Sequence, residues 1–412
     1  MRRSWGKGLC LPLTVIGFLT GIGSYNPAKA QTFSVANTAK FQDICRNTNG
    51  QGNGVLPSSK LNPSNPNSIC PLILGQTVSG GATKVTGAGA NSPAQIEVEK
   101  VRERSILVAS REGGGGSADT LATSWDSRSN VFLLAGIESL RHPNNDFEEG
   151  YDSTLPSITL GADYRVTKAF SMGVAFNYSH WDARFDSAGG FDVDSYGPLF
   201  FLHFLPFDRA FANVVFGYAR QNNARSRQAE VQSDPGGASL FNGLAPGNTD
   251  SNQYRLSILT GYDYPIASFT IGPRVGLDVT HWQVGSYQEG GNTGLELQYR
   301  GLDVTSVLSS IGATTTLAFR TAFGTVVPEL TATWVHEFAN DQRTIRAKVV
   351  EAPNSLEFIF QREPPARNWA VINLAVSALL SRSQHLFANF MTVQGNQNFK
   401  TYGGTIGMLV KW

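Results

Sequence analysis

Charged side chains are scarce in this 412-residue chain, which has 16% Asp, Glu, Lys and Arg, whereas soluble domains carry about 25%. Long apolar runs are scarce too. After residue 30 no uninterrupted apolar stretch reaches the length of a membrane-spanning helix, which argues against a helical membrane protein. The formal net charge is +1, and it becomes −3 without residues 1–30, which hold four bases and no acid. That balance predicts no nucleic-acid partner, because phosphate neutralisation needs a basic surface.

Cysteine is also rare, with three residues in the whole chain. No CxxC pair or Cys/His spacing indicates a metal site, and we expect no metal and no cofactor. Cys10 lies in a leader, which leaves Cys45 and Cys70. In an oxidising compartment an even pair predicts one disulfide, and the alternative is two free thiols that never meet.

The first thirty residues have the pattern of a secretory signal peptide. Arg2 and Arg3 give a positive start, an apolar core follows over 9–22, and Ala28 and Ala30 are the small residues that signal peptidase requires. We therefore expect cleavage after Ala30 and export by the general secretion pathway.

Residues 31–91 form a short low-complexity region rich in Asn, Gly, Ser and Pro, too small to bury much core alone. A linker spans 92–124. Ser92 as N-cap and Pro93 in the first turn predict a charged helix over 92–109. The glycines at 113–116 predict a flexible joint rather than a phosphate loop, because no Lys-Ser/Thr follows them.

From residue 125 to 412 the hydrophobic period is two. Phe170, Met172, Val174 and Phe176, for example, alternate with small or polar residues, which is typical of strands with one apolar face. The pattern predicts twelve strands, several of them longer than soluble strands usually are. Their ranges are 129–141, 154–166, 169–182, 192–206, 209–222, 252–264, 268–283, 303–320, 323–338, 369–381, 384–395 and 399–412.

The connections between these strands alternate between tight and long. Links at 167–168, 207–208 and 321–322 are tight, whereas 223–251 and 339–368 are long and polar. This layout predicts an all-β fold, a transmembrane antiparallel β-barrel of about 12 strands with both ends in the periplasm. The alternative of a soluble all-β domain fits the leader and the aromatic residues poorly.

Aromatic and charged residues along the predicted strands give each face a role. Aromatic girdles form where rings meet lipid headgroups, and charged residues are expected to line the lumen, because ions are costly in hydrocarbon. The predicted outer-rim girdle is Trp181, Trp282, Trp334 and Trp369, and the inner-rim girdle includes Tyr164 and Tyr264. The predicted lumen residues are Asp163, Arg165, Arg255, Asp263, Arg274, Asp278, Glu329 and Glu337.

The last strand ends in the pattern polar-x-Gly-x-x-apolar-x-aromatic. Thr405, Gly407, Val410 and Trp412 occupy its defined positions. It looks like the signal by which the outer-membrane insertion machinery recognises its clients. The alternative is an ordinary last strand that happens to end on Trp.

Three stretches of the sequence together resemble the autotransporter β-domain family, the translocators of type V secretion, over roughly 120–412. They are 328–338, with Pro-Glu-Leu and then Trp-Val-His-Glu-Phe; the early strands at 159–165 and 172–175; and the terminus at 402–412. The resemblance implies a twelve-stranded barrel with a helix threaded through its pore and an N-terminal passenger carried to the surface. This chain departs from the family in its passenger of only about 90 residues. No paired-Asn cleavage site is visible, and we expect the region to stay attached.

No catalytic constellation is visible, and we expect no enzyme. His336 and Glu337 are strand neighbours, which point to opposite faces. His142 lies near Asp146, Glu148 and Glu149 in what we interpret as a solvated acidic loop.

Two functions remain open. The first is a translocator barrel that anchors or exports its own N-terminal segment to the cell surface. The second is a porin-like channel or structural barrel with a periplasmic N-terminal region. Both place a monomeric barrel in the lipid of a Gram-negative outer membrane. A receptor, the pore selectivity and the fate of the linker cannot be read from the sequence.

Overall fold

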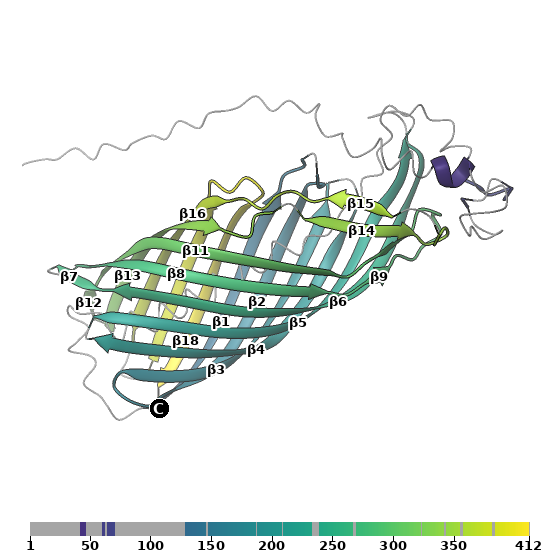
Figure 1. The fold of residues 1–412 in the computed structure, drawn as a ribbon. Helices are drawn as coiled ribbons and strands as arrows, with labels where there is room; N and C mark the ends of the chain where they lie inside the picture. The colour runs from purple at the N-terminus through teal and green to yellow at the C-terminus, as the bar shows by residue number, and fades with distance from the viewer. Residues whose placement is uncertain are drawn as a thin grey trace, which may run out of the picture.

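The computed structural model describes residues 42–46, 60–61, 64–70 and 128–411, with short breaks at 146, 187, 208, 233–238, 267–268, 323, 342, 355–356 and 381–383. A short α-helix covers 42–46, and the rest is built almost entirely of strands (Figure 1). Within these ranges, no helix has the length and apolar character to cross a membrane.

Twelve long strands form one closed antiparallel barrel, as the sequence predicts. In chain order they are β1 (Ser129–His142), β2 (Tyr151–Arg165), β3 (Phe170–Phe185), β4 (Gly189–Phe207), β5 (Ala210–Gln232), β6 (Ser239–Tyr262), β8 (Phe269–Val284), β11 (Leu302–Leu317), β13 (Gly324–Glu337), β16 (Asn368–Leu379), β17 (Gln384–Gln394) and β18 (Lys400–Lys411).

Pairing of the first and last strands closes the barrel. β1 and β18 are in register from Asn130 opposite Lys411 to Arg141 opposite Lys400, and β8 pairs with β11 over its whole length. Closure leaves no unpaired strand edge in the wall, which is the condition for a sheet to lie in lipid.

The two ends of the barrel differ. At one, here called the short-turn end, tight turns join the strands, and the short strands β7 (Tyr264–Ile266) and β12 (Phe319–Thr321) continue two of the hairpins. Gly324 opens β13 there with φ +146°, and a Cβ on it would lie 2.0 Å from the carbonyl oxygen of Leu379. The barrel starts and stops at this end, because Asn130 pairs with Lys411. The opposite end, with long connections, is here called the long-loop end.

Residues alternate between the outer and inner faces of each strand. Val174 and Ile406 are exposed on the outside, and Phe132 and Val215 are buried inside. Hydrophobic side chains that face outward along all twelve strands are costly in water and stable in hydrocarbon. The outer face is therefore a membrane-facing surface.

The hairpin of β5 and β6 extends much further than the sequence indicates. The link expected at 223–251 is largely strand, and the pairs run on to Val231 opposite Phe241. The alternation disappears there because a hairpin above the membrane has no lipid-facing side. Arg225 and Arg227 on β5 lie opposite Gly247 and Ala245 on β6, so the sequence here shows no apolar face of period two.

A second sheet lies at the long-loop end, built from loops that the sequence left unassigned. Its four strands lie in the order β15-β14-β10-β9; here they are called the surface sheet. Their bounds are β9 (Tyr287–Gln288), β10 (Leu297–Tyr299), β14 (Thr344–Val349) and β15 (Phe358–Gln361). A bridge between Gly247 and Glu289 joins the surface sheet to β6.

Candidate functional site: the barrel lumen and the long-loop end

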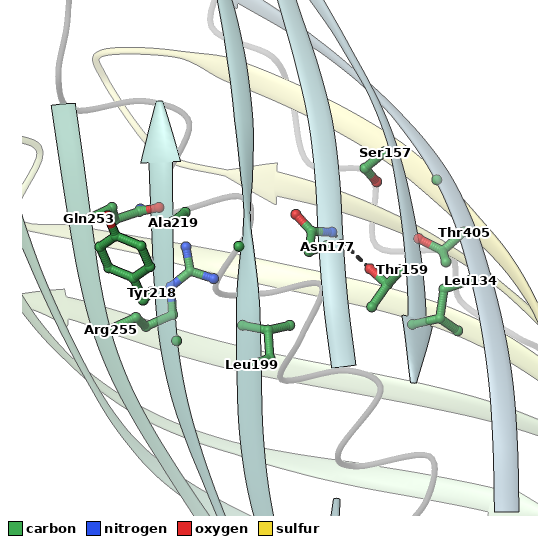
Figure 2. A pocket seen from close by; sticks show the side chains of 13 residues that line it. Leu134, Ser157, Thr159, Asn177, Leu199, Tyr218, Ala219, Gln253, Arg255 and Thr405 are labelled. Carbon is green, nitrogen blue, oxygen red and sulfur yellow. Dashed lines mark hydrogen bonds between the residues drawn. The ribbon is translucent and has the colours of Figure 1, made fainter. Parts of the chain in front are cut away.

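The lumen holds a cavity of about 720 Å³ between the walls formed by β1 to β6 and β18 (Figure 2). Small residues line much of it, among them Gly136, Gly197, Gly217 and Ala219. A twelve-stranded barrel lies between the small barrels that side chains fill and the wide porins that hold an open channel. Short side chains on the wall widen the lumen further.

Polar side chains line the remainder of this cavity. The amide of Asn177 donates to the hydroxyl of Thr159 at 2.8 Å, and Arg255 projects from β6 (Figure 2). On the far wall the Thr314 and Thr331 hydroxyls are 2.9 Å apart.

The charged residues predicted for the lumen lie on the inner face of the wall. Asp163, Arg255, Asp263, Arg274, Asp278, Glu329 and Glu337 are all buried there, and Arg165 is half-buried at a strand end. Arg274 donates to Asp263 at 2.5 Å and lies over the ring of Phe211. The amide of Asn130 donates to Asp163 at 2.5 Å. These wall charges are therefore held at fixed positions.

Four phenylalanines make an apolar layer inside the short-turn half of the lumen. Each lies directly opposite a glycine on the neighbouring strand and covers it. The pairs are Phe132 with Gly161, Phe201 with Gly173, Phe211 with Gly261 and Phe387 with Gly407. A Cβ at any of these glycines would lie under 3 Å from the ring, so each pair locks two strands together and narrows the lumen.

The predicted outer-rim girdle is wrong at three of its four positions. Trp181, Trp282 and Trp369 are buried inside the barrel, and only Trp334 faces outward. The reason is the period itself: Tyr178 faces out, so Trp181, three residues on, must face in. Trp181 packs inside against Phe191, with 4.6 Å between ring centroids.

Tyrosines take the place of the missing tryptophans. Like Trp334, four tyrosines face outward: Tyr178, Tyr196, Tyr218 and Tyr254. At the short-turn end, Tyr164 and Tyr264 are exposed where the sequence places them. From Tyr254 to Tyr264 the wall runs about 34 Å, or roughly 24 Å of height at a tilt of about 45°. That height matches the apolar band of an outer-membrane barrel, about 25 Å.

The last strand carries the predicted assembly residues in two orientations. Gly407 lies under the Phe387 ring inside the barrel, and the backbone amide of Thr405 donates to Asn389 at 2.8 Å. Val410 is half-buried. Trp412, like the signal peptide with Ala28 and Ala30 and the linker at 92–124, lies outside the described residues.

His336 and Glu337 lie on opposite faces, as strand neighbours must. His336 is half-buried, and its ring contacts Asn368, whereas Glu337 is buried and accepts hydrogen bonds from the backbone amides of Val307 and Ala339. The interpretation of the 142–149 loop as solvated is wrong, because His142, Glu148 and Glu149 are buried. Interaction with other long loops explains their burial. In the described ranges no group of three His, Cys, Asp or Glu has the geometry to hold a metal ion.

The disulfide predicted from the cysteine count is present and joins Cys45 to Cys70. The segment that it staples packs against the surface sheet at the long-loop end (Figure 1). The two parts share one hydrophobic core. It comprises Ile44, Cys45, Leu61, Ile69 and Cys70 from the segment, and Leu295, Leu297, Tyr299, Ala347, Val349, Ala352, Phe358 and Phe360 from the loops.

Hydrogen bonds fix the stapled segment at this position. The backbone amide of Lys60 donates to Glu351 at 2.9 Å, and the Lys60 ammonium group donates to the carbonyl of Asn292. Gly294 has φ +79°, and a Cβ there would lie 2.6 Å from Cβ of Lys60. The segment and the loops therefore fit closely enough to require glycine at this contact.

A buried ion pair ties the surface sheet to the β5–β6 hairpin. Arg227 donates through two nitrogens to Glu289 at 2.8 and 2.6 Å, and also to the carbonyl of Leu295. Glu289 also accepts from the Leu297 amide and the Tyr299 hydroxyl. Burial raises the pKa of Tyr299 well above its ordinary value. This anchor was not expected, because both partners lie in loops that the sequence left unassigned.

The comparisons with known proteins agree with this architecture. The family described as autotransporter β-domain matches residues 133–390. The translocator domain of NalP from Neisseria meningitidis is 13% identical, with TM-score 0.56, covering 79% of this chain and 100% of that one. The β-domain of the Bordetella autotransporter BrkA is 15% identical, with TM-score 0.50, covering 69% and 100%. At these identities the likeness shows the fold. No curated protein matches the chain.

Proposed function

The chain belongs to the autotransporter β-domain family, and from that premise we propose that its outer-membrane barrel exports its own N-terminal segment and keeps it at the cell surface. The observation that carries the proposal is the position of the disulfide-stapled segment. Its hydrophobic residues complete the core of the surface sheet at the long-loop end. In outer-membrane barrels the long loops face outside the cell and the short turns face the periplasm.

Topology supports the same direction of transport. Cys70 lies at the long-loop end, whereas Ser129, opposite Tyr164, starts the barrel at the short-turn end. We therefore infer that the chain between them crosses the height of the barrel. Backbone without hydrogen-bond partners cannot cross lipid, which leaves the lumen as the route.

The intervening length is sufficient. A strand of 16 residues such as β8 rises about 38 Å at about 3.4 Å per residue and a tilt of about 45°. Residues 71–128 would reach about 90 Å even as a continuous helix at about 1.5 Å per residue. The chain length in excess of the barrel height lets the stapled segment reach the surface sheet.

An epitope tag inserted after Gln31 tests the proposal on intact cells. We expect antibody and added protease to reach the tag without opening the outer membrane. A tag after the exposed Asn354 is the control for the outside, and a tag between Thr167 and Lys168 in a short turn is the control for the periplasm. A Gln31 tag that behaves like the periplasmic control would refute export and favour a porin-like or structural barrel.

A further inference from the structure

The chain that leaves β15 does not return directly to the barrel wall. Residues 362–366, here called the mouth strap, lie between β15 and β16 and contact loops that are distant in the sequence. The Asn398 side chain, from the β17–β18 connection, donates to the carbonyl of Pro364 at 2.8 Å. The backbone amide of Arg362 donates to the carbonyl of Arg343 at 2.8 Å. The mouth strap is thus held from both sides.

An ion pair and a histidine–carboxylate contact join the mouth strap to the first hairpin of the barrel. Arg362 donates to Glu148 at 2.9 Å, and both side chains are buried. The next residue, Glu363, lies 3.1 Å from the ring nitrogen Nε2 of His142. His142 is itself buried and stacks on Tyr151. Arg362, Glu148 and His142 are buried and Glu363 is half-buried, so solvent screens these contacts less than surface pairs.

Beneath the mouth strap is a cavity of about 520 Å³ that reaches from one wall of the barrel to the opposite wall. His142 on β1 lines it, and so do Trp282 on β8 and Ser306 on β11. In the closed ring β8 is six strands away from β1 in either direction, so the two strands face each other across the lumen. The mouth strap therefore lies over the opening and not along its rim.

The position of the mouth strap also brings two cationic side chains, Arg343 and Arg362, close together. Burial, and then the nearby Arg362 guanidinium, lower the pKa of Arg343 to about 10. Glu148 offsets this repulsion by pairing with Arg362. Without Glu148, Arg362 would remain buried next to another cation, which favours movement of the mouth strap into water.

We propose that the mouth strap is the outer gate of the pore. It swings aside while chain passes and then closes over the part of the opening that the attached linker leaves free, held by the Arg362–Glu148 and Glu363–His142 pairs. The gating role rests on the export function proposed above. The position of the mouth strap over the opening can be tested without it.

Accessibility beneath the mouth strap is the direct test. Ser306→Cys places a thiol in the cavity, where the native serine is 5% exposed. The purified, oxidised full chain in detergent micelles is treated with a bulky polyethylene-glycol maleimide, and labelling is followed by gel shift. We expect slow labelling of Ser306→Cys alone and labelling about tenfold faster or more when Arg362→Gln and Glu363→Gln are added, because unpaired partners leave the buried site.

Arg367→Gln is the matched control, because Arg367 is exposed just beyond the mouth strap and its side chain donates to Asn340, outside the mouth strap. Glu148→Gln, on the other side of the ion pair, must accelerate labelling as well. The shift in gel mobility on heating shows that each variant barrel is folded. Fast labelling without the strap changes, or equal rates in all the variants, would overturn the proposal. Neither result depends on where the Gln31 tag lies.

Discussion

The ion pair of Arg227 and Glu289 should control whether the surface sheet stays folded. Both side chains are 3% exposed and are joined by two charge-assisted hydrogen bonds. Arg227→Met leaves the Glu289 carboxylate buried, and Glu289→Met leaves the Arg227 guanidinium buried. Removing one partner of a buried pair costs about 3–5 kcal/mol.

The double variant should cost less than the two single changes added together. It leaves no buried charge, and methionine fills much of the vacated volume. The remaining cost comes from the Leu297 amide and the Tyr299 hydroxyl, which lose Glu289 as acceptor, and from the Leu295 carbonyl, which loses Arg227 as donor. Each such loss costs about 1–3 kcal/mol. We therefore expect a coupling energy of about 1–3 kcal/mol between the two positions.

Hydrogen exchange of amides inside the surface sheet measures these energies locally. Suitable reporters are Val350, which donates to the carbonyl of Glu296, and Arg300, which donates to the carbonyl of Arg346. A loss of about 3 kcal/mol speeds exchange through local opening by about 150-fold. Amides of the barrel wall should keep their protection, because the pairing of β1 with β18 closes the barrel independently of the surface sheet.

Additive effects of the two single changes would refute this reasoning, because they would show that the two charges do not stabilise one another. Loss of protection throughout the barrel wall would also refute it. That result would mean that the surface sheet and the barrel unfold as one unit.

Three further changes have defined outcomes. Gly407→Ala puts a Cβ about 2.1 Å from the Phe387 ring and should destabilise the barrel by about 1–3 kcal/mol in urea unfolding. Burial raises the pKa of Tyr299, so the folded surface sheet favours the neutral phenol. This contribution to stability is fully present below the ordinary tyrosine pKa of about 10 and is lost as the pH rises further. Protease resistance of the surface sheet should therefore fall above about pH 10, and less steeply in Tyr299→Phe. Replacing Cys45 and Cys70 by alanine should weaken docking of the stapled segment by about 3 kcal/mol, measured as faster proteolysis of that segment.

The twelve barrel strands could be predicted because the membrane imposes a strict pattern. A strand with lipid on one side and lumen on the other must alternate, and the predicted range 169–182 differs from β3 at 170–185 by only a few residues. Beyond the membrane this constraint disappears. The surface sheet was missed for that reason, together with the outer parts of β5 and β6.

The tryptophans show a different kind of error. The alternation that locates Tyr178 on the outer face also places Trp181 inside, so the answer was present in the sequence. In this barrel the strand period outweighs the general preference of tryptophan for membrane interfaces. At the long-loop end the inner wall of the barrel carries separate apolar clusters, and Trp181, Trp282 and Trp369 belong to them.

The cysteine count and the leader predicted the disulfide, but no local pattern could predict where the stapled segment docks. Lys60 and Glu351 are 291 residues apart, and neither carries a recognisable motif. The shared core explains why docking has to occur. A mostly polar segment of about 60 residues cannot bury enough apolar surface to fold alone. Without this segment, the surface sheet would expose Leu297, Val349 and Phe358 to water. Each part supplies the apolar surface that the other lacks. If the segment is exported as proposed, the shared core alone retains it on the barrel, and no covalent link is needed to hold it there. Cleavage of the linker would then leave it on the barrel, and a released segment would argue against the shared core.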